Sequence, residues 1–340
     1  MANRTGSVIR LEGRPVILGS AAVGTRREAD GPLGSRFDRI FPDAKLGEPS
    51  WEKAESALQR EALERAFDAA SLSPRSAQLI LAGDLLNQCT ASAFGIRGMA
   101  IPFAGMYGAC STMALTLATA GILTDCGAAE IAAVCTSSHY CAAEKQFRMP
   151  LEYGGQRTPT AQWTATAAGA AVIGRTGSGP RIEAAVYGSI VDLGVRDSAN
   201  MGAAMAPAAC ETIASFLRDT GTSPQEYDMI LTGDLGVVGS KLLVQLLERE
   251  HGLQIQRVHA DCGMMLYDRA KQDVHAGGSG CGCSASVVCG HILRRLREHA
   301  LHRVLFVATG ALLSAVSVKQ GESIPGIAHG VLLTDGEGRG

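Results

Sequence analysis

The residue best placed for chemistry in this sequence is Cys110. It follows a Gly-Ala pair and precedes residues 113–124, whose small and apolar side chains predict a helix buried on all sides. Free backbone N–H groups and the helix dipole at such a position favour the thiolate and lower the thiol pKa. The same N–H groups, with the hydroxyls of Ser111 and Thr112, can hold an anion. We predict a nucleophile or an anion site here; the alternative is a small core residue that starts a helix.

The sequence segments that we expect to position this cysteine occur twice in the chain. Residues 73–85 and 223–235 share a Ser-Pro pair, an apolar run and a Gly-Asp-Leu turn, at a constant offset of 150 residues. A second block, which begins at residue 108, is echoed from residue 281 at an offset of 173. We infer an ancient duplication and expect the functional site at the seam between the two halves.

Each half, residues 1–178 and 179–340, is predicted to build one α/β unit. Alternating strands and helices predict mainly parallel sheets, and two units packed by their helices give a five-layer αβαβα sandwich. Residues 139–163 and about 241–280 break the repeat, so we expect added function there. The predicted helices are 51–71 with Ser50 as N-cap, 113–124, 208–218 and 284–298, and the predicted strands are 78–82, 131–134, 170–173, 229–231, 304–307 and 331–333.

The bulk composition excludes several classes of protein. With 46% hydrophobic and 19% charged residues, the chain can bury a large core and is not disordered. A formal charge of -2 gives no electrostatic case for a nucleic-acid partner. The first residues do not resemble a signal peptide, and no window is apolar over membrane-spanning length. We therefore expect a soluble chain made in the cytosol.

The ten cysteines are predicted to be reduced, because most lie in apolar or Ala/Gly-rich surroundings without a secretion signal. A zinc site could draw on four residues, namely His259, Cys262, Cys281 and Cys283, but they lack paired CxxC spacing. We predict no metal and no cofactor. Residues 277–283 lack the Gly-Lys-Ser/Thr ending of a phosphate loop, so we predict a tight turn against the Cys110 segment, with Cys283 buried.

The duplication, the Gly-Ala-Cys-Ser-Thr segment and the Gly-led last strand resemble the thiolase superfamily of condensing enzymes over essentially the whole chain. Within that superfamily, several long strings are similar to the stage V sporulation protein AD family. These strings are DGPLGS at 30–35, AGDLLNQ at 82–88, YGACST at 107–112, QFRMP at 146–150, EYGGQ at 152–156, MAPAA at 205–209 and ATGALLS at 308–314.

The resemblance implies a spore-former's protein that binds pyridine-2,6-dicarboxylic (dipicolinic) acid and supports its uptake into the developing spore. It implies other stage V sporulation A membrane proteins as partners, and a homodimer formed through the first half. The chain has no spanning segment or lipidation motif. We therefore expect synthesis in the forespore cytoplasm and attachment to the inner spore membrane through those partners.

Condensing chemistry needs more than Cys110, because a His or Asn from the second half must help bind the thioester oxygen. The place after the strand at 229–231 reads Thr-Gly-Asp, and the helix start after 277–283 offers no His. His329 remains available, but one partner does not complete the set. A carboxylate at Asp234 opposes developing negative charge. We therefore predict binding without catalysis; a Cys110 acyltransferase and a purely structural subunit are the rivals.

A planar dianion needs donors at both carboxylates and a wall for its ring. The Cys110 segment supplies one end, and the candidates for the other are His139, Lys145 and Arg148. Phe147 and Tyr153 are candidates for the wall. His139 can instead be a satisfied turn residue, Lys145 a solvated charge, and Arg148 a brace paired with a glutamate at 144 or 152.

Two further pairs follow from comparing the halves. Asp84 and Asp234 occupy matching positions, which favours capping of the following turn or helix for both. Asn87 and Gln88 differ from the residues at 236 and 237, so they are better ligand candidates.

Overall fold

The strands form two runs of five with the same internal order. The computed structural model describes residues 2–147 and 157–337. Numbered along each half, both runs read third, second, fourth, fifth, first. The runs are β6 (Phe103–Gly105), β5 (Leu79–Gly83), β7 (Ile131–Ser138), β9 (Ala167–Gly174) and β3 (Val16–Thr25), and β12 (His259–Asp261), β11 (Met229–Thr232), β14 (Arg303–Ala311), β15 (Gly326–Thr334) and β10 (Arg181–Tyr187).

The prediction of mainly parallel sheets was wrong in part. β5 and β11 pair in parallel with both of their neighbours. The fifth strand of each run, β9 or β15, pairs antiparallel on both sides. The two runs touch at the pair Arg181↔Val16.

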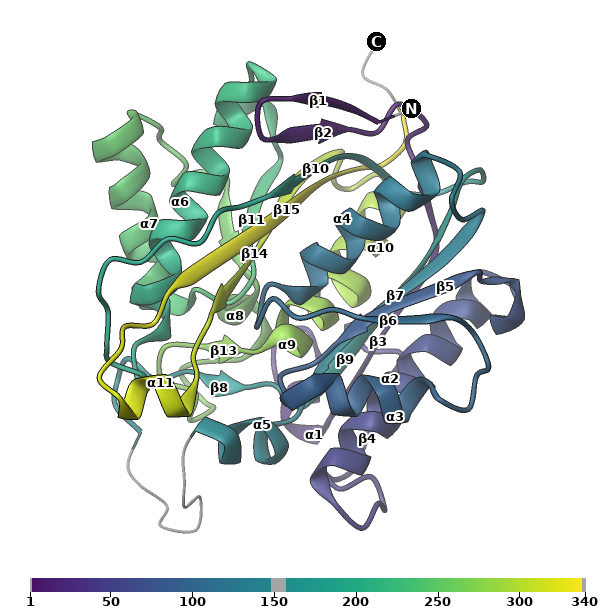
Figure 1. Ribbon diagram of the computed structural model, residues 1–340, viewed down its shortest axis with the longest axis horizontal. Coiled ribbons are helices and arrows are strands. Elements are labelled where there is room, and N and C mark those ends of the chain that lie inside the picture. The colour runs from purple at the N-terminus through teal and green to yellow at the C-terminus, as the bar shows by residue number, and fades with distance from the viewer. Residues whose placement is uncertain (1, 148–156, 338–340) are drawn as a thin grey trace.

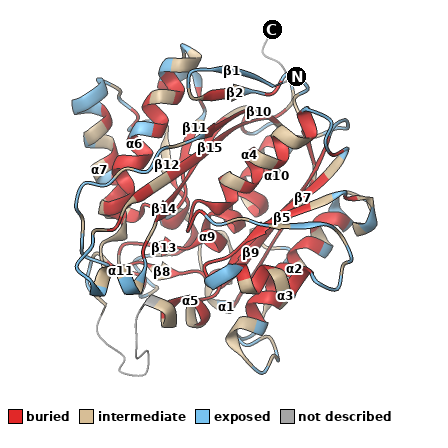
Figure 2. Ribbon diagram, in the orientation of Figure 1, coloured by how far each residue is buried: buried red, intermediate tan, exposed pale blue. Residues whose placement is uncertain are grey.

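Helices lie outside both runs and between them, giving the five layers that the sequence predicts (Figure 1). The middle layer is buried over most of its surface (Figure 2). The outer helices are α2 (Trp51–Ala69) and α3 (Thr90–Ile96) on one side and α6 (Met201–Thr220) and α7 (Gly236–His251) on the other; the middle layer holds α4 (Thr112–Asp125) and α9 (Cys281–Val287), which runs through a π-helical turn into α10 (Leu293–Arg297).

Capping residues and helical periodicity in the sequence account for most of these elements. The Ser50 side chain accepts from the Lys53 N–H, which confirms the predicted N-cap of α2. The second-half helix predicted at 208–218 begins earlier, at Met201. The prediction missed α7, although its buried Leu243 and Leu247 lie on one helical face. Residues 140–147 form α5 (Tyr140–Phe147) within the segment that has no counterpart in the second half.

The halves meet by close backbone approach. The short strand β13 (Gly278–Ser279) pairs with β8 (Trp163–Thr164) across the seam. At the start of α9, a Cβ on Gly282 would lie 2.2 Å from the Ala167 carbonyl oxygen and 2.6 Å from the Ser138 nitrogen. The predicted packing of residues 277–283 against the Cys110 segment is confirmed by the cluster of Cys281 with Cys110, and Cys283 is fully buried as predicted. The boundary at 178/179, as a division into two domains, stays a prediction.

None of the helices within residues 2–147 and 157–337 has the length and apolar character that a membrane span requires.

Gly282→Ala should lower the free energy of unfolding by about 1–3 kcal/mol or more, because the added methyl meets backbone atoms that cannot move aside. Gly98→Ala is the matched control, since a Cβ there meets no atom within 4 Å. Urea unfolding of both variants measures the difference. Equal midpoints for the two variants would contradict the close contact at the seam.

Candidate functional site

Cys110 lies on a tight turn, residues 108–112, which we call the elbow. Ala109 has a φ of +50°, a left-handed conformation that turns the chain into α4. The Ser111 hydroxyl donates to the Gly108 carbonyl at 2.6 Å, and the Thr112 hydroxyl donates to the Ala109 carbonyl at 2.6 Å. Both predicted ligand hydroxyls therefore stabilise the elbow, and neither side chain lines the pocket at Cys110.

Asp234 from the second half faces the elbow. It is fully buried between β11 and α7. Its carboxylate accepts from the Ser279 hydroxyl at 3.0 Å, the Gly280 N–H at 2.9 Å and the Thr309 hydroxyl at 3.0 Å. The Cys110 thiol pairs with the same carboxylate. The prediction that Asp234 caps its own turn was wrong, because all of these partners are distant in sequence.

Burial and the pairing of Cys110 with Asp234 determine the protonation states of these two side chains. Burial raises the pKa of Asp234 to about 6, against the opposing effect of its hydrogen bonds. Burial, and next the charge of Asp234, raise the pKa of the Cys110 thiol well above its usual value. The predicted lowering of the thiol pKa was therefore wrong. The helix dipole is outweighed by desolvation and by a carboxylate, so Cys110 stays a neutral thiol.

The matching residue Asp84 behaves as predicted. Its carboxylate accepts from the Leu86 N–H at 2.8 Å, and from the Ser92 N–H at 2.8 Å and hydroxyl at 2.6 Å. These groups belong to the following turn and to the first turn of α3. The capping role is confirmed for Asp84 alone, and the two halves differ at this position in function.

A narrow pocket opens above Cys110, with about 30 Å³ of room for water-sized molecules. Within the part of the chain that the structure describes, no lysine or arginine lines it. Its walls carry polar side chains that are already bonded: Gln162 donates to the Asp234 and Gly278 carbonyls, and Thr164 donates to Glu144. The lining residues are Leu85, Tyr107, Ala109, Cys110, Glu144, Ala161, Gln162, Thr164, Ser198, Ala199, Met201, Ser279, Ala311 and Leu313.

Tyr107 marks the entrance of this pocket. Burial raises the pKa of its phenol to about 12, so its hydroxyl stays protonated and able to donate. Leu85, Tyr107 and Leu313 also line a wider surface groove of about 620 Å³. Asn87 and Gln88 lie in that groove, so they are placed at the approach to the pocket and not in its wall.

Two predicted ligand residues lie elsewhere. The His139 ring donates from Nε2 to the Ala44 carbonyl at 2.7 Å and accepts the Ala142 N–H at Nδ1. Burial lowers its pKa, so it is a neutral, satisfied residue packed against Trp51. Lys145 forms an ion pair with Glu52. Neither lines the pocket, because both face the α2 side of α5.

The remaining predicted residues divide into two groups. His329 on β15 lies beside Gly108 with its ring edge-on to Tyr187, and burial lowers its pKa to about 4. It is neutral and is not part of the pocket wall. Arg148 and Tyr153 lie outside the described residues, as does the side chain of Phe147.

The four residues considered for zinc do not form a cluster. His259 Nε2 bonds the Thr232 hydroxyl at 3.0 Å, and the Cys281 thiol donates to the Ser137 carbonyl at 2.8 Å. Cys262 and Cys283 are fully buried in the core between the sheets. The residues that the sequence reasoning missed as pocket lining are Tyr107, Gln162 and Ser279. Each lies in a segment that was singled out, but only the folded seam brings these segments together.

Asp234→Asn should raise the free energy of unfolding at neutral pH by up to about 3 kcal/mol, because the folded protein then no longer holds a buried charge. With a pKa raised to about 6, Asp234 costs stability above that pH, and the cost vanishes below the ordinary aspartate value of 3.8. Urea midpoints at about pH 8 and about pH 4 test this sign. A variant that is less stable at the higher pH would contradict it.

Comparison with known proteins agrees with this architecture. A profile of the family Stage V sporulation protein AD (SpoVAD) matches residues 5–334. Stage V sporulation protein AD of Bacillus subtilis (strain 168) is 46% identical over 320 residues, which cover 94% of each chain.

Two solved structures share the fold at low sequence identity. 3-oxoacyl-[acyl-carrier-protein] synthase III from Aquifex aeolicus VF5 has a TM-score of 0.59 and 13% identity, and AbyA1, a tetronic acid condensing enzyme, has 0.60 and 17%. Each alignment covers 94% of this chain and 99% of the other. The predicted thiolase-like fold is thereby confirmed. By its profile and its relative, the chain belongs to the stage V sporulation protein AD family.

Proposed function

We propose that this sporulation-family protein binds dipicolinic acid in the pocket above Cys110 and does not catalyse acyl transfer. Family membership and the resemblance of the strings quoted above support the choice of ligand. The observation that carries the absence of catalysis is the pairing of the Cys110 thiol with the buried Asp234 carboxylate.

A cysteine nucleophile acts as a thiolate, and the thiolate is the species that this site disfavours. In the acyl-transfer transition state the negative charge of the thiolate moves onto the thioester oxygen. Here Asp234 and Ser279 face the sulfur from the second half, where a condensing enzyme needs a neutral or positive donor. The carboxylate of Asp234 therefore disfavours both the thiolate and the negative charge on the thioester oxygen.

The lining of the pocket and of the groove at its entrance suits a small planar ligand. Leu85, Leu313 and the Tyr107 ring supply apolar wall, and the Tyr107 hydroxyl supplies a donor at the entrance. At the elbow the Ser111 and Thr112 N–H groups already donate to the Gly108 and Ala109 carbonyls, so the helix dipole of α4 is what favours one carboxylate there. Arg148, outside the described residues, stays the predicted partner of the second carboxylate.

The acidic wall sets a condition on this binding. A dianion next to Glu144 and Asp234 is repelled unless a proton or a cation accompanies it. Asp234 can take up this proton. Its pKa is about 6, close to neutral pH, and the negative charge of a bound ligand raises this pKa further. We infer that the ligand binds together with a proton taken up by Asp234.

The setting follows from the same family membership. We propose that the chain acts at the inner spore membrane in a channel complex with other stage V sporulation A membrane proteins, and supports uptake of the ligand into the developing spore. We also propose a homodimer through the first half. Within the described residues, β6 is the edge strand of its run. The half-exposed Phe94 and the partly exposed Phe103 lie beside this edge of the sheet.

The rival, a condensing enzyme that uses Cys110, predicts a covalent intermediate. Incubation of the protein with acyl-CoA should leave no acyl group on Cys110, because the thiol stays protonated. Intact-protein mass spectrometry before and after alkaline treatment measures thioester-bound acyl groups. An adduct that is present in the unaltered protein and absent from Cys110→Ala would establish the rival.

Isothermal titration with dipicolinate should show saturable binding whose affinity falls roughly tenfold per pH unit above about pH 6, as one proton is taken up per ligand. Asp234→Asn should bind with little pH dependence, because its amide needs no proton. Cys110→Ala and Arg148→Ala should weaken binding in the unaltered background. A flat titration at every pH would overturn the ligand; unchanged affinity across the range would overturn the proton coupling alone.

A further inference from the structure

Two groups of potential metal ligands stand outside the elbow in the described parts of the chain. One lies at the end of β15, where Asp335 already accepts from His299, from His302 and from the Glu337 N–H. These bonds use the lone pairs that a metal would need. The other group, Cys210, Glu250 and His251, has its ligand atoms within 4.8 Å of one another and lacks such a network.

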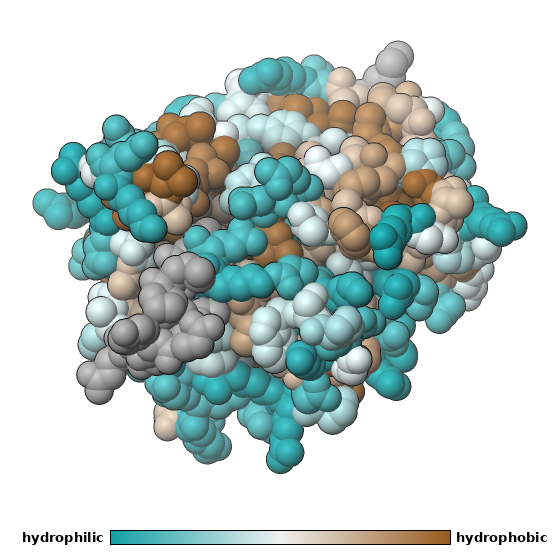
Figure 3. All heavy atoms as spheres, turned by 60° about the horizontal axis from the view of Figure 1, so that its bottom comes forward, coloured by the Kyte–Doolittle hydropathy of each residue, from teal (hydrophilic) through white to brown (hydrophobic). Residues whose placement is uncertain are grey.

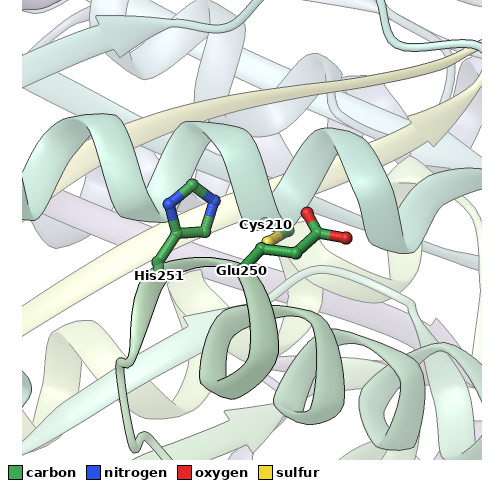
Figure 4. Close-up of side chains that lie close together, drawn as sticks. All are labelled: Cys210, Glu250 and His251. Atoms are coloured by element: carbon green, nitrogen blue, oxygen red, sulfur yellow. The ribbon is translucent and has the colours of Figure 1, made fainter.

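Packing of α6 against α7 brings the second group together. Gly202 and Gly239 let the two helices approach closely near their N-termini, because a Cβ on Gly239 would lie 2.7 Å from the Gly202 carbonyl oxygen. Further along, Leu243 and Leu247 of α7 pack in the same core cluster as Cys210 of α6. The last turn of α7 therefore comes to lie over Cys210 (Figure 4).

The side chains form a set that suits a borderline metal ion. Cys210 offers a sulfur, His251 an imidazole nitrogen and Glu250 a carboxylate. Glu211, next to Cys210, places Oε1 3.5 Å from His251 Nε2 and can supply a fourth ligand. Zinc is bound in proteins by three or four ligands of these types in a tetrahedral arrangement.

The charges around the sulfur also favour a cation. Burial raises the pKa of Cys210 to about 12, and the charges of Glu250 and Glu211 add to the effect. No lysine or arginine within residues 2–147 and 157–337 forms an ion pair with either glutamate. A divalent ion would instead favour the thiolate of Cys210. The ion forms a bond to the sulfur, and the thiol proton leaves to solvent.

Rotation of the side chains can bring the ligand atoms around one ion, because these atoms already lie within 4.8 Å of one another. The Glu250 carboxylate and the His251 ring lie on opposite sides of the Cys210 sulfur (Figure 4). Both residues are exposed at the surface, so their rotamers can change freely. His251 also borders a surface groove of about 370 Å³, which leaves a path for the ion.

We propose that Cys210, Glu250 and His251, with Glu211, form a binding site for one divalent transition-metal ion, with zinc as the best fit. This site lies on the outer helical layer of the second half and is independent of the pocket above Cys110. It ties the end of α7 to α6 when the ion is bound.

Cobalt(II) is the probe, because a cobalt–thiolate bond gives a near-ultraviolet charge-transfer band that carboxylate or imidazole ligands alone do not give. Titration of the reduced protein with Co²⁺ should produce this band at one equivalent, with release of one proton per ion, and Zn²⁺ should abolish it. His251→Gln, at the surface, should weaken Co²⁺ binding at least about tenfold.

Cys210→Ser should abolish the band, while Cys126→Ser, which removes an exposed thiol elsewhere, should leave it unchanged. Circular dichroism checks that both variants are folded, and His251→Gln tests the site if Cys210→Ser is not. Absence of the band in the unaltered protein, or its persistence in a folded Cys210→Ser variant, would overturn the proposal. Equal affinity in His251→Gln would overturn it as well.

Discussion

The site depends on one interaction, the contact of a buried thiol from the first half with a buried carboxylate from the second. Asp234 could not remain in the core without its three donors, since an unpaired buried carboxylate costs several kcal/mol or more. Those donors come from the turn before α9 and from β14. The positions of β13, β14 and the elbow are therefore linked through a single side chain, and the pocket above Cys110 exists because these segments stay together.

The duplicated architecture explains how such a contact arises. Both halves use the same strand order, and each has an aspartate after its second strand. In the first half, Asp84 serves its own turn and α3. In the second half, the Leu235 and Gly236 N–H groups at the start of α7 donate to Asp261, and the Asp234 carboxylate instead accepts from distant residues. Equivalent residues thus acquired different roles.

Sequence patterns predicted the scaffold better than the site. Helical periodicity, the Ser50 cap and apolar runs identified most of the strands and the helices of the middle layer, because these signals are local. The antiparallel fifth strands and the pairing of Asp234 with Cys110 depend on partners distant in sequence, which no local pattern reveals. His139 was predicted as a ligand-binding residue from its residue type. Its hydrogen bonds with the Ala44 carbonyl and the Ala142 N–H, which satisfy the ring, are visible only in the folded chain.

The neutral state of Cys110 bears on the chemical lifetime of the protein. Oxidation and alkylation of cysteine proceed through the thiolate, so a thiol held far above its usual pKa reacts slowly with peroxides and electrophiles. Held as a protonated thiol, Cys110 keeps its place in the packing of the elbow and avoids the gradual chemical damage that an activated nucleophile accumulates with age.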